Sequence, residues 1–361
     1  MSDRITTIYI WITMLVTIGV IAVMLLVGDP SKHASEGKMV QTAESSASEA
    51  ADSEYVFYEW SNELAENSMH IYLPSEIGQQ HVIVDNEYRN KMIRISIAKQ
   101  PEGTLSQAFF YDHPMLMNAT AKEVKLSESA EQVELEFVFE SMFEWEMKLE
   151  KENGQNCLYL QLIRPHDKYE KIVVLDAGHG GEDAGHMIAG EDEVTVLQEK
   201  QLAASVVGKA GNLLEKDGIC VYYTRQGDEN PSQQQRVELA NETQADMLIS
   251  VHADYSDDTT LYGMRTIYNE TYFIPNFASA DLAYLLLEKV AASTNEKALG
   301  FEPGTNEAEL IQNAMVPVAQ LYIGYLSNKQ EQKLLSREDY IDRIAKGVYD
   351  AVMASYEEME K

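Results

Sequence analysis

The chain has 361 residues, and 45% of them are hydrophobic, which is enough to form the cores of about two domains with appended segments. Acidic residues outnumber basic residues by 59 to 28, so the formal net charge is −31. Because nucleic acids are bound largely through Lys and Arg contacts to phosphates, this charge argues against a nucleic-acid partner and favours a neutral or cationic polymer.

Residues 8–27 (IYIWITMLVTIGVIAVMLLV) form an apolar stretch of 20 residues without a charged side chain. As a helix, this stretch would be about 30 Å long, which is the thickness of the hydrocarbon core of a bilayer. Cleaved signal peptides have shorter apolar regions, of roughly 7–15 residues, followed by a small-residue cleavage site. We therefore expect residues 1–28 to be a cytoplasmic tip and an uncleaved, single-pass transmembrane helix in the cell membrane.

Residues 29–53 are rich in Ser, Ala and Glu and contain hardly any large apolar side chain. A segment of this composition cannot bury enough apolar surface to offset the conformational entropy that it would lose on folding. We expect it to be a flexible, acidic linker that holds the rest of the chain away from the membrane.

Residues 54–166 have an alternating pattern of apolar and polar side chains, clearest in the segments 93–97, 133–139, 145–149 and 158–162. Alternation of this kind indicates half-buried strands, and the ENG stretch between the last two segments is a turn signal. This part of the sequence therefore predicts a small all-β domain. It contains no group of His, Cys or paired carboxylates with catalytic spacing, so we interpret it as a binding or spacer module.

Residues 170–361 have a different pattern, in which apolar strands alternate with helical segments. The expected strands are 173–175, 219–223, 247–251 and 317–323, and the expected helices are 200–215, 236–244, 280–292 and 338–356. Such alternation predicts an α/β domain whose parallel or mixed sheet is covered by helices on both faces. In sheets of this kind, ligands collect at the carboxyl ends of the strands.

Two histidines follow expected strands of this domain: His179 lies in the stretch LDAGHGG, and His252 lies in LISVHAD. Either histidine alone is most simply explained as a satisfied loop or core residue, but two at the ends of strands of one sheet can converge on a metal ion. Catalytic zinc commonly has three protein ligands drawn from His and carboxylate groups. By spacing alone, the third ligand could be any of Glu182, Asp183, Glu193 and Glu199.

Several residues near these histidines are expected to have structural roles. We expect Asp176 and Asp183 to accept backbone hydrogen bonds in the loop that carries His179, and Arg225 and Arg236 to tie loops and helix ends together. His186 is expected to be a surface group or a residue behind the metal ligands. The glycines around His179 let the backbone turn sharply and approach a ligand closely.

Six motifs occur in order along the second half of the chain: VVLDAGHGGEDAG at 173–185, QEKQLA at 198–203, GICVYYTR at 218–225, RVELAN at 236–241, ADMLISVHAD at 245–254 and GYLSN at 324–328. Together they resemble the zinc-dependent N-acetylmuramoyl-L-alanine amidases of the amidase-3 type, over residues 171–359. The resemblance implies a three-layer α/β/α catalytic domain with a twisted, mostly parallel sheet.

The resemblance also implies a site and a reaction. Zinc would be held by His179, Glu199 and His252, because the family's metal-binding Glu precedes a Lys at the start of a helix, as Glu199 precedes Lys200. The bond cut would be the amide between N-acetylmuramic acid and L-alanine in peptidoglycan. An enzyme acting on the cell wall would have its main part on the extracytoplasmic side of the membrane. By position and strand pattern, residues 54–166 resemble the AMIN-type β-sandwich modules that precede wall amidase domains.

The sequence departs from the family at the general base. Family members have a Glu two positions before the Gly of the GYLSN-type motif, and this chain has Tyr322 there. A phenol with a pKa near 10 is a poor proton acceptor at neutral pH, although it can donate a hydrogen bond to an oxyanion. Proton transfer could instead fall to another carboxylate, for which the sequence offers Asp254, Glu307 and Glu309.

Two main hypotheses follow from this departure. The first is a membrane-anchored amidase, in which the metal alone gives slow hydrolysis or another carboxylate replaces the base. The second is a catalytically impaired pseudo-amidase that binds zinc and peptidoglycan and acts as a binding or regulatory module, with protein regulators as partners. We favour the first, because three zinc ligands are easily lost when they are not used. A zinc hydrolase with another amide substrate is a remote third hypothesis.

Overall fold

A computed structural model describes residues 56–58, 68–73, 77–99, 116–125, 131–152, 154–189, 196–304 and 308–361. The transmembrane helix expected at residues 8–27 and the linker expected at residues 29–53 lie outside these ranges. Among the helices of the described ranges, none has the length and hydropathy that crossing a bilayer would need.

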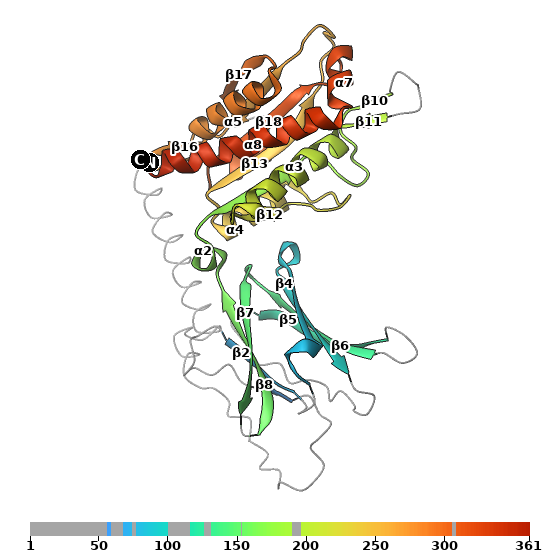
Figure 1. The fold of residues 1–361 in the computed structure, drawn as a ribbon, viewed down its shortest axis with the longest axis vertical. Coiled ribbons are helices and arrows are strands. Elements are labelled where there is room, and N and C mark those ends of the chain that lie inside the picture. The colour runs from blue at the N-terminus through green and yellow to red at the C-terminus, as the bar shows by residue number, and fades with distance from the viewer. Residues whose placement is uncertain are drawn as a thin grey trace, which may run out of the picture. The chain divides into compact units, whose positions relative to one another are not determined.

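The described residues from 56 to 163 form two four-stranded antiparallel sheets (Figure 1). The first has the order β1-β2-β8-β7, with β1 Val56–Tyr58, β2 Ser68–Leu73, β7 Glu144–Glu152 and β8 Gln155–Ile163. The second has the order β3-β4-β6-β5, with β3 Val82–Glu87, β4 Met92–Lys99, β5 Leu116–Lys125 and β6 Glu131–Phe139. The short helices here are η2 Gln79–His81, η3 Tyr88–Asn90 and α2 Pro165–Lys168.

The two sheets share one core, to which each contributes the apolar side chains of its alternating strands. Ile95 of β4 and Leu135 of β6 are directly paired across one sheet and fully buried, and Leu158 of β8 belongs to the same apolar cluster. Successive side chains of a strand point to opposite faces, so the alternation in the sequence places one row inside and leaves the other at the surface. The described strands of this part are therefore arranged as the alternation predicts.

The second half of the chain has a six-stranded sheet with the order β12-β9-β13-β18-β14-β17. The strands are β9 Ile172–Ala177, β12 Cys220–Tyr223, β13 Met247–Asp254, β14 Met264–Tyr268, β17 Ala298–Pro303 and β18 Val318–Tyr325. Only the β14 and β18 pair is antiparallel, so the expectation of an α/β domain with a mostly parallel sheet is confirmed. Two small hairpins accompany this sheet: β10 Met187–Ala189 with β11 Val196–Gln198, and β15 Phe273–Ile274 with β16 Phe277–Ala278.

Helices cover both faces of this sheet (Figure 1). Helices α3 Glu199–Lys216, α5 Ser279–Thr294 and α8 Glu338–Met359 share one apolar cluster with the sheet, and α4 Gln233–Thr243 and α6 Glu309–Asn313 share the other. Val173 and Val174, neighbours in β9, belong to different clusters because their side chains point to opposite faces. Helix α7 Lys329–Leu335 follows β18.

Three central strands bring the site residues together. Strands β9, β13 and β18 are adjacent and parallel, so their carboxyl ends lie at one edge of the sheet. His179 follows β9, His252 lies near the end of β13, and Tyr322 is paired with His252 on β18. Glu199 is the first residue of α3. The fold therefore collects at one edge the residues that the sequence singled out.

Candidate metal centre

The backbone after β9 is shaped so that His179 turns toward the neighbouring strand. His179 itself has a left-handed conformation, with φ of 60°, which is uncommon for a residue other than glycine. Gly178, just before it, lies against the ring of His252: a Cβ added at Gly178 would come within 2.3 Å of that ring. A glycine is therefore needed at position 178 for the two imidazoles to approach each other, and their ring centroids are 5.0 Å apart.

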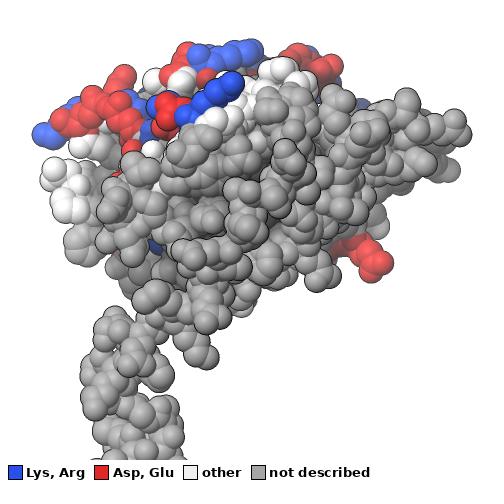
Figure 2. Space-filling model, turned by 90° about the horizontal axis from the view of Figure 1, so that it is seen from below, with Lys and Arg blue, Asp and Glu red and all other residues white. Residues whose placement is uncertain are grey.

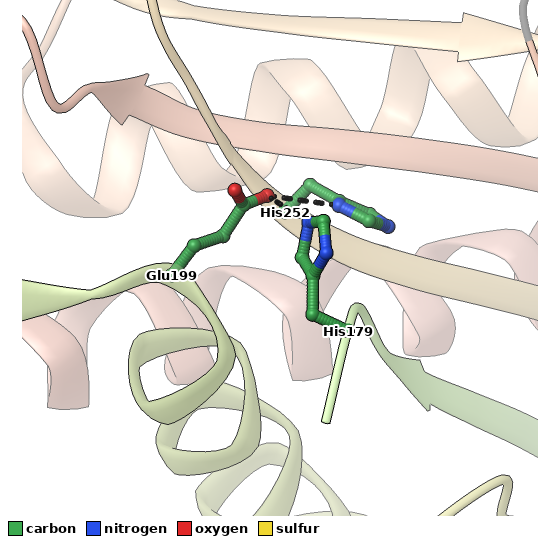
Figure 3. Close-up of side chains that lie close together, drawn as sticks. All are labelled: His179, Glu199 and His252. Carbon is green, nitrogen blue, oxygen red and sulfur yellow. Dashed lines mark hydrogen bonds and ion pairs between the residues drawn. The ribbon is translucent and has the colours of Figure 1, made fainter. Parts of the chain in front are cut away.

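Glu199 is the residue on which the two histidines converge. Its side chain is only 1% exposed. Its Oε1 atom lies 3.0 Å from Nε2 of His179 and 2.9 Å from Nδ1 of His252, and it accepts a hydrogen bond from the backbone N–H of Ala253 at 3.1 Å. Figure 3 shows the carboxylate at the start of α3 facing the two imidazoles.

The donor atoms of His179, Glu199 and His252 all lie within 4.8 Å of one another, so these residues fit a metal ion. Two imidazole nitrogens and one carboxylate oxygen form a ligand set that is typical of catalytic zinc. Burial opposes the charge of Glu199, but the hydrogen bonds from His179 and His252 dominate and hold its pKa well below the usual range. A buried carboxylate of this kind requires positive charge where the three groups meet, and a metal cation would supply it.

The other carboxylates considered for the third ligand do not lie at this point. Asp183 lies on the far side of His179, where its Oδ2 is 2.8 Å from Nδ1, the nitrogen that faces away from Glu199. Glu182 is exposed, and Glu193 lies outside the described residues. Asp183 thus orients the ring of His179, as carboxylates behind metal-bound histidines commonly do. It also accepts a hydrogen bond from the backbone N–H of Gly185, as expected.

Asp176 differs from the expectation, because its partners are side chains rather than backbone groups. It is fully buried at the end of β9 and accepts hydrogen bonds from Thr224 at 2.5 Å, Ser250 at 2.5 Å and Arg236 at 2.6 Å. Burial raises the pKa of Asp176, but the charge of Arg236 and the three donors outweigh it, so the pKa is lowered overall. The three partners come from β13, from α4 and from the residue after β12, and the sequence did not reveal that they meet at Asp176.

Two arginines support the loop that carries His179, as expected. Arg236 donates to the carbonyl oxygens of Ala177 at 2.8 Å and His179 at 2.9 Å. Arg225 donates to the carbonyl oxygens of Ala177 at 2.9 Å and Gly178 at 3.0 Å. Both guanidinium groups are buried, so these bonds fix the path of the loop from within the protein.

Tyr322 lies beside the metal ligands, where the resemblance places the general base. Its ring centroid is 6.0 Å from that of His252, and the guanidinium of Arg265 lies 4.0 Å above its ring. Gln320 donates a hydrogen bond to its hydroxyl at 2.8 Å. These contacts make Tyr322 a hydrogen-bonding and stacking residue of the site.

The alternative carboxylates for proton transfer are in different situations. Asp254 accepts a hydrogen bond from Arg265 at 2.6 Å, so its charge is already paired. Glu309 is exposed at the start of α6, and Glu307 lies outside the described residues. The structure therefore brings together the three candidate metal ligands and Tyr322, and it places no unpaired carboxylate among the described residues at the position of the expected base.

Comparison with known proteins identifies the same half of the chain. The model of the amidase-3 family, described as N-acetylmuramoyl-L-alanine amidase, matches residues 173–354. The germination-specific N-acetylmuramoyl-L-alanine amidase of Bacillus subtilis is 28% identical over 202 residues, which cover 52% of this chain and 81% of that protein. The amidase LytC of the same organism is 27% identical over 186 residues, and the match covers 36% of its length.

One solved structure that resembles this chain is the catalytic domain of CwlV, an N-acetylmuramoyl-L-alanine amidase from Bacillus (Paenibacillus) polymyxa var. colistinus. It is 28% identical, with a TM-score of 0.46, and the match covers 52% of this chain and 99% of that domain.

Proposed function

Since this chain belongs to the amidase-3 family of N-acetylmuramoyl-L-alanine amidases, we propose that it is a zinc-dependent hydrolase that cuts the amide between N-acetylmuramic acid and L-alanine in peptidoglycan. The observation that carries the proposal is the meeting of His179, Glu199 and His252 at the carboxyl edge of the sheet, with their donor atoms within 4.8 Å of one another. Two relatives named as amidases support the reaction class, at 27% and 28% identity over half of this chain.

The chemistry divides between the metal and the side chains around it. Zinc, when bound, lowers the pKa of a water molecule to about 7 and polarises an amide carbonyl. His179 and His252 would supply nitrogen ligands, and the buried carboxylate of Glu199 would balance part of the metal charge. Asp183 keeps Nε2 of His179 directed toward the site by holding Nδ1. These residues bind and orient, and none of them needs to form a covalent bond to substrate.

Tyr322 is proposed to act as a hydrogen-bond donor rather than as a base. Its hydroxyl accepts a hydrogen bond from Gln320, and a phenol O–H is also a donor that suits an oxygen on which negative charge develops. The nearby guanidinium of Arg265 favours negative charge at the same place. Because a positioned general base contributes typically about 10²–10⁴-fold to a rate, we expect the enzyme to be slower than relatives that have a Glu at this position.

The location is proposed from the sequence. The apolar stretch at residues 8–27 would anchor the protein in the cell membrane by a single helix. The amidase part would then face the wall on the extracytoplasmic side, where its substrate lies. Residues 29–53 would act as the tether between membrane and enzyme.

A second candidate function is a pseudo-amidase that binds zinc and peptidoglycan without turnover. The observation that favours it is the environment of Tyr322, where Gln320 and Arg265 hold the phenol in place of a carboxylate. Such a protein would serve as a binding or regulatory module for other wall hydrolases.

One experiment separates the two candidates. Purified protein is incubated with peptidoglycan, with and without zinc and after treatment with a chelator, and the release of stem peptides is measured beside a His179→Ala control. Release that depends on zinc and is absent from the control supports the amidase. Tight zinc binding without release would favour the pseudo-amidase. A protein that binds no zinc would contradict both.

A further inference from the structure

The second carboxylate oxygen of Glu199 has partners of its own, which the proposed reaction does not use. Oε1 faces His179 and His252, whereas Oε2 lies 3.0 Å from the backbone N–H of His186 and 3.0 Å from the Nδ1 atom of the same residue. We propose that His186 is a positioning residue, which occupies Oε2 of Glu199 so that the carboxylate offers only Oε1 to the metal, and that Tyr255 holds His186 in this role.

The tautomer of His186 follows from its partner. A carboxylate binds a metal ion in its ionised form. An ionised carboxylate only accepts hydrogen bonds. Nδ1 of His186 therefore carries a hydrogen and donates it to Oε2 of Glu199.

The small hairpin before α3 places His186 opposite Glu199. Met187 of β10 is paired with Gln198 of β11, so the residues before and after this pair also face each other. The backbone N–H of Glu199 donates to the carbonyl oxygen of His186 at 2.9 Å, while the backbone N–H of His186 donates to Oε2. The backbone of Gly185 also lies close against the carboxylate of Glu199, since a Cβ added at Gly185 would come within 2.6 Å of Oε2. Backbone pairing thus sets the distance between His186 and the carboxylate.

Occupation of Oε2 has a consequence for the metal. With two donors on Oε2, binding of both carboxylate oxygens to the metal would break two hydrogen bonds inside a site that is nearly closed to solvent at Glu199. Binding through Oε1 alone keeps those bonds. It also leaves more of the coordination sphere for water and substrate, as a catalytic zinc site needs.

Tyr255 explains why a half-exposed imidazole keeps its orientation. The side chain of His186 is 49% exposed, so the bond to Glu199 alone would compete with water. The rings of His186 and Tyr255 are stacked, with centroids 5.1 Å apart and an angle of 3° between their planes. Tyr255 directly follows β13, the strand that carries His252, so the stacking ties His186 to the framework of a metal ligand.

The test is the zinc affinity of the full chain, measured by competition with a chromophoric chelator. This inference rests on the proposed zinc site, so wild type and His179→Ala are measured first. His186→Ala should weaken zinc binding by about 10–100-fold, as loss of partners behind metal ligands typically does. His186→Asn, whose side-chain N–H can replace Nδ1–H, should restore most of the affinity. Tyr255→Ala should weaken binding, and Tyr255→Phe should not.

Two further measurements distinguish positioning from a general structural role. Without metal, His186→Ala should unfold at the temperature of the wild type, and only the stabilisation gained on adding zinc should decrease. With Co²⁺ in place of zinc, the visible spectrum should change in His186→Ala, because only the backbone N–H of residue 186 then donates to Oε2, and binding of both oxygens of Glu199 would break one hydrogen bond instead of two. Met187→Ala, a 55% exposed neighbour, is the matched control and should behave as wild type in both.

The outcomes separate this inference from the proposed function. If wild type binds zinc, His179→Ala does not, and His186→Ala binds as tightly as wild type with the same Co²⁺ spectrum, the role of His186 is wrong and the metal site stands. The role of His186 would also be wrong if metal-free His186→Ala unfolded at a clearly lower temperature than the wild type and His186→Asn did not restore the zinc affinity. If the wild type binds no zinc, the proposed function and this inference both fail.

Discussion

At the scale of single residues, the metal centre depends on groups that hold the ligands as much as on the ligands. Asp183 is the clearest case, because its Oδ2 lies 2.8 Å from Nδ1 of His179. Burial raises the pKa of Asp183, but the backbone N–H of Gly185 and the imidazole of His179 lower it overall, so the carboxylate is charged at neutral pH. A charged acceptor on Nδ1 fixes the ring and increases the basicity of Nε2.

We therefore predict that Asp183→Ala weakens zinc binding by about 10-fold or more. The measurement is the competition titration with a chelator, with Glu182→Ala as control because Glu182 is an exposed neighbour in the same loop. Asp183→Ala should also lower the rate of stem-peptide release at limiting zinc, and excess zinc should restore part of it. Equal affinities of Asp183→Ala and the control would show that the ring of His179 needs no such support.

Tyr322 provides a second residue-scale prediction. Replacing it with Glu supplies a carboxylate beside His252, where the family has its general base, and should raise kcat by up to about 10²–10⁴-fold. The gain should be smaller than this limit, because the guanidinium of Arg265 lies 4.0 Å from the ring of Tyr322 and would pair with the new carboxylate. Tyr322→Phe, which lacks only the hydroxyl, is the matched control and should be slower than wild type.

The measurement is the initial rate of stem-peptide release at saturating zinc, with zinc affinity determined for each variant. If Tyr322→Glu bound zinc as tightly as wild type but its kcat did not rise, the pocket around position 322 would differ from that of the family in more than the general base. A rate for Tyr322→Phe equal to that of wild type would remove the hydrogen-bonding role proposed for the phenol.

At the scale of elements, a buried carboxylate connects α7 to the end of β18. Glu331 is 3% exposed and accepts hydrogen bonds from the backbone N–H groups of Gly263 at 3.0 Å and Tyr325 at 2.6 Å. Burial raises the pKa of Glu331 to about 7, although the two backbone donors oppose this, and the charges of Glu296 and Asp254 add to it. The carboxyl group thus titrates near neutral pH in the folded protein.

The sign of the effect on stability follows from the raised pKa. The folded state binds the proton of Glu331 more tightly than the unfolded state does, so the stabilisation is present at acidic pH and is lost as pH rises through about 7. Relative to Glu331→Gln, the wild type should lose on the order of 3 kcal/mol of unfolding free energy between pH about 5 and about 8. Denaturant titrations of both proteins across this range measure the difference, and parallel pH profiles would contradict the prediction.

The sequence revealed the elements whose pattern is strong. Buried strands such as β9 and β13, and the long amphipathic helix α8, have clear apolar periodicity, and all three were predicted near their observed positions. Strands β14 and β17 were not predicted. Every residue of β17 is exposed, so this edge strand has no buried row to produce an alternating pattern. Its position follows from pairing with β14, which is a tertiary contact.

The candidate site was predictable to a similar extent. The strand ends pointed to His179 and His252, because backbone topology brings them to one edge of the sheet. Spacing left four acids open for the third position, and only the family motif singled out Glu199, which the structure places with the two histidines. Two hydrogen bonds were not predicted, namely the one between His179 and the carboxylate of Asp183 and the one between His186 and the carboxylate of Glu199. Both depend on side-chain directions in a loop and a short hairpin. The position of His186, three residues after Asp183 in the metal-binding loop, was the available signal, and it indicated only proximity.

At the scale of the molecule, the net charge of −31 does not appear as a uniformly acidic surface where the described residues are visible. Figure 2 shows Lys and Arg side chains beside Asp and Glu side chains on the face that it displays. Several cations are bound in pairs, such as Lys91 with Glu242 and Lys200 with Asp228. On this visible, described part no continuous basic patch is seen, in line with the inference that the partner is not a nucleic acid.

The β-sheets of residues 56–163 are connected to the α/β part by a buried polar cluster centred on Glu144. This residue of β7 is 7% exposed, and its carboxylate accepts hydrogen bonds from the hydroxyl of Tyr222 at 2.7 Å, the hydroxyl of Tyr169 at 3.2 Å and Nζ of Lys168 at 3.2 Å. Tyr222 lies in β12, an edge strand of the six-stranded sheet. One carboxylate therefore joins side chains that belong to the two parts.

This arrangement predicts that the two parts unfold together and that Glu144→Ala separates them. Removing the carboxylate leaves the buried hydroxyl of Tyr222 without its acceptor, which costs roughly 1–3 kcal/mol, while the ammonium of Lys168 keeps its bond to the carbonyl oxygen of Trp145. The three tryptophans, Trp11, Trp60 and Trp145, all precede the α/β part, so tryptophan fluorescence reports on the N-terminal half, while release of zinc reports on the metal centre. In urea, the two signals should change at one midpoint in the wild type and at different midpoints in Glu144→Ala.

The control is Glu146→Ala, at an exposed position of the same strand, in which the two midpoints should still coincide. Coincident midpoints in Glu144→Ala would mean that contacts other than this cluster couple the two parts.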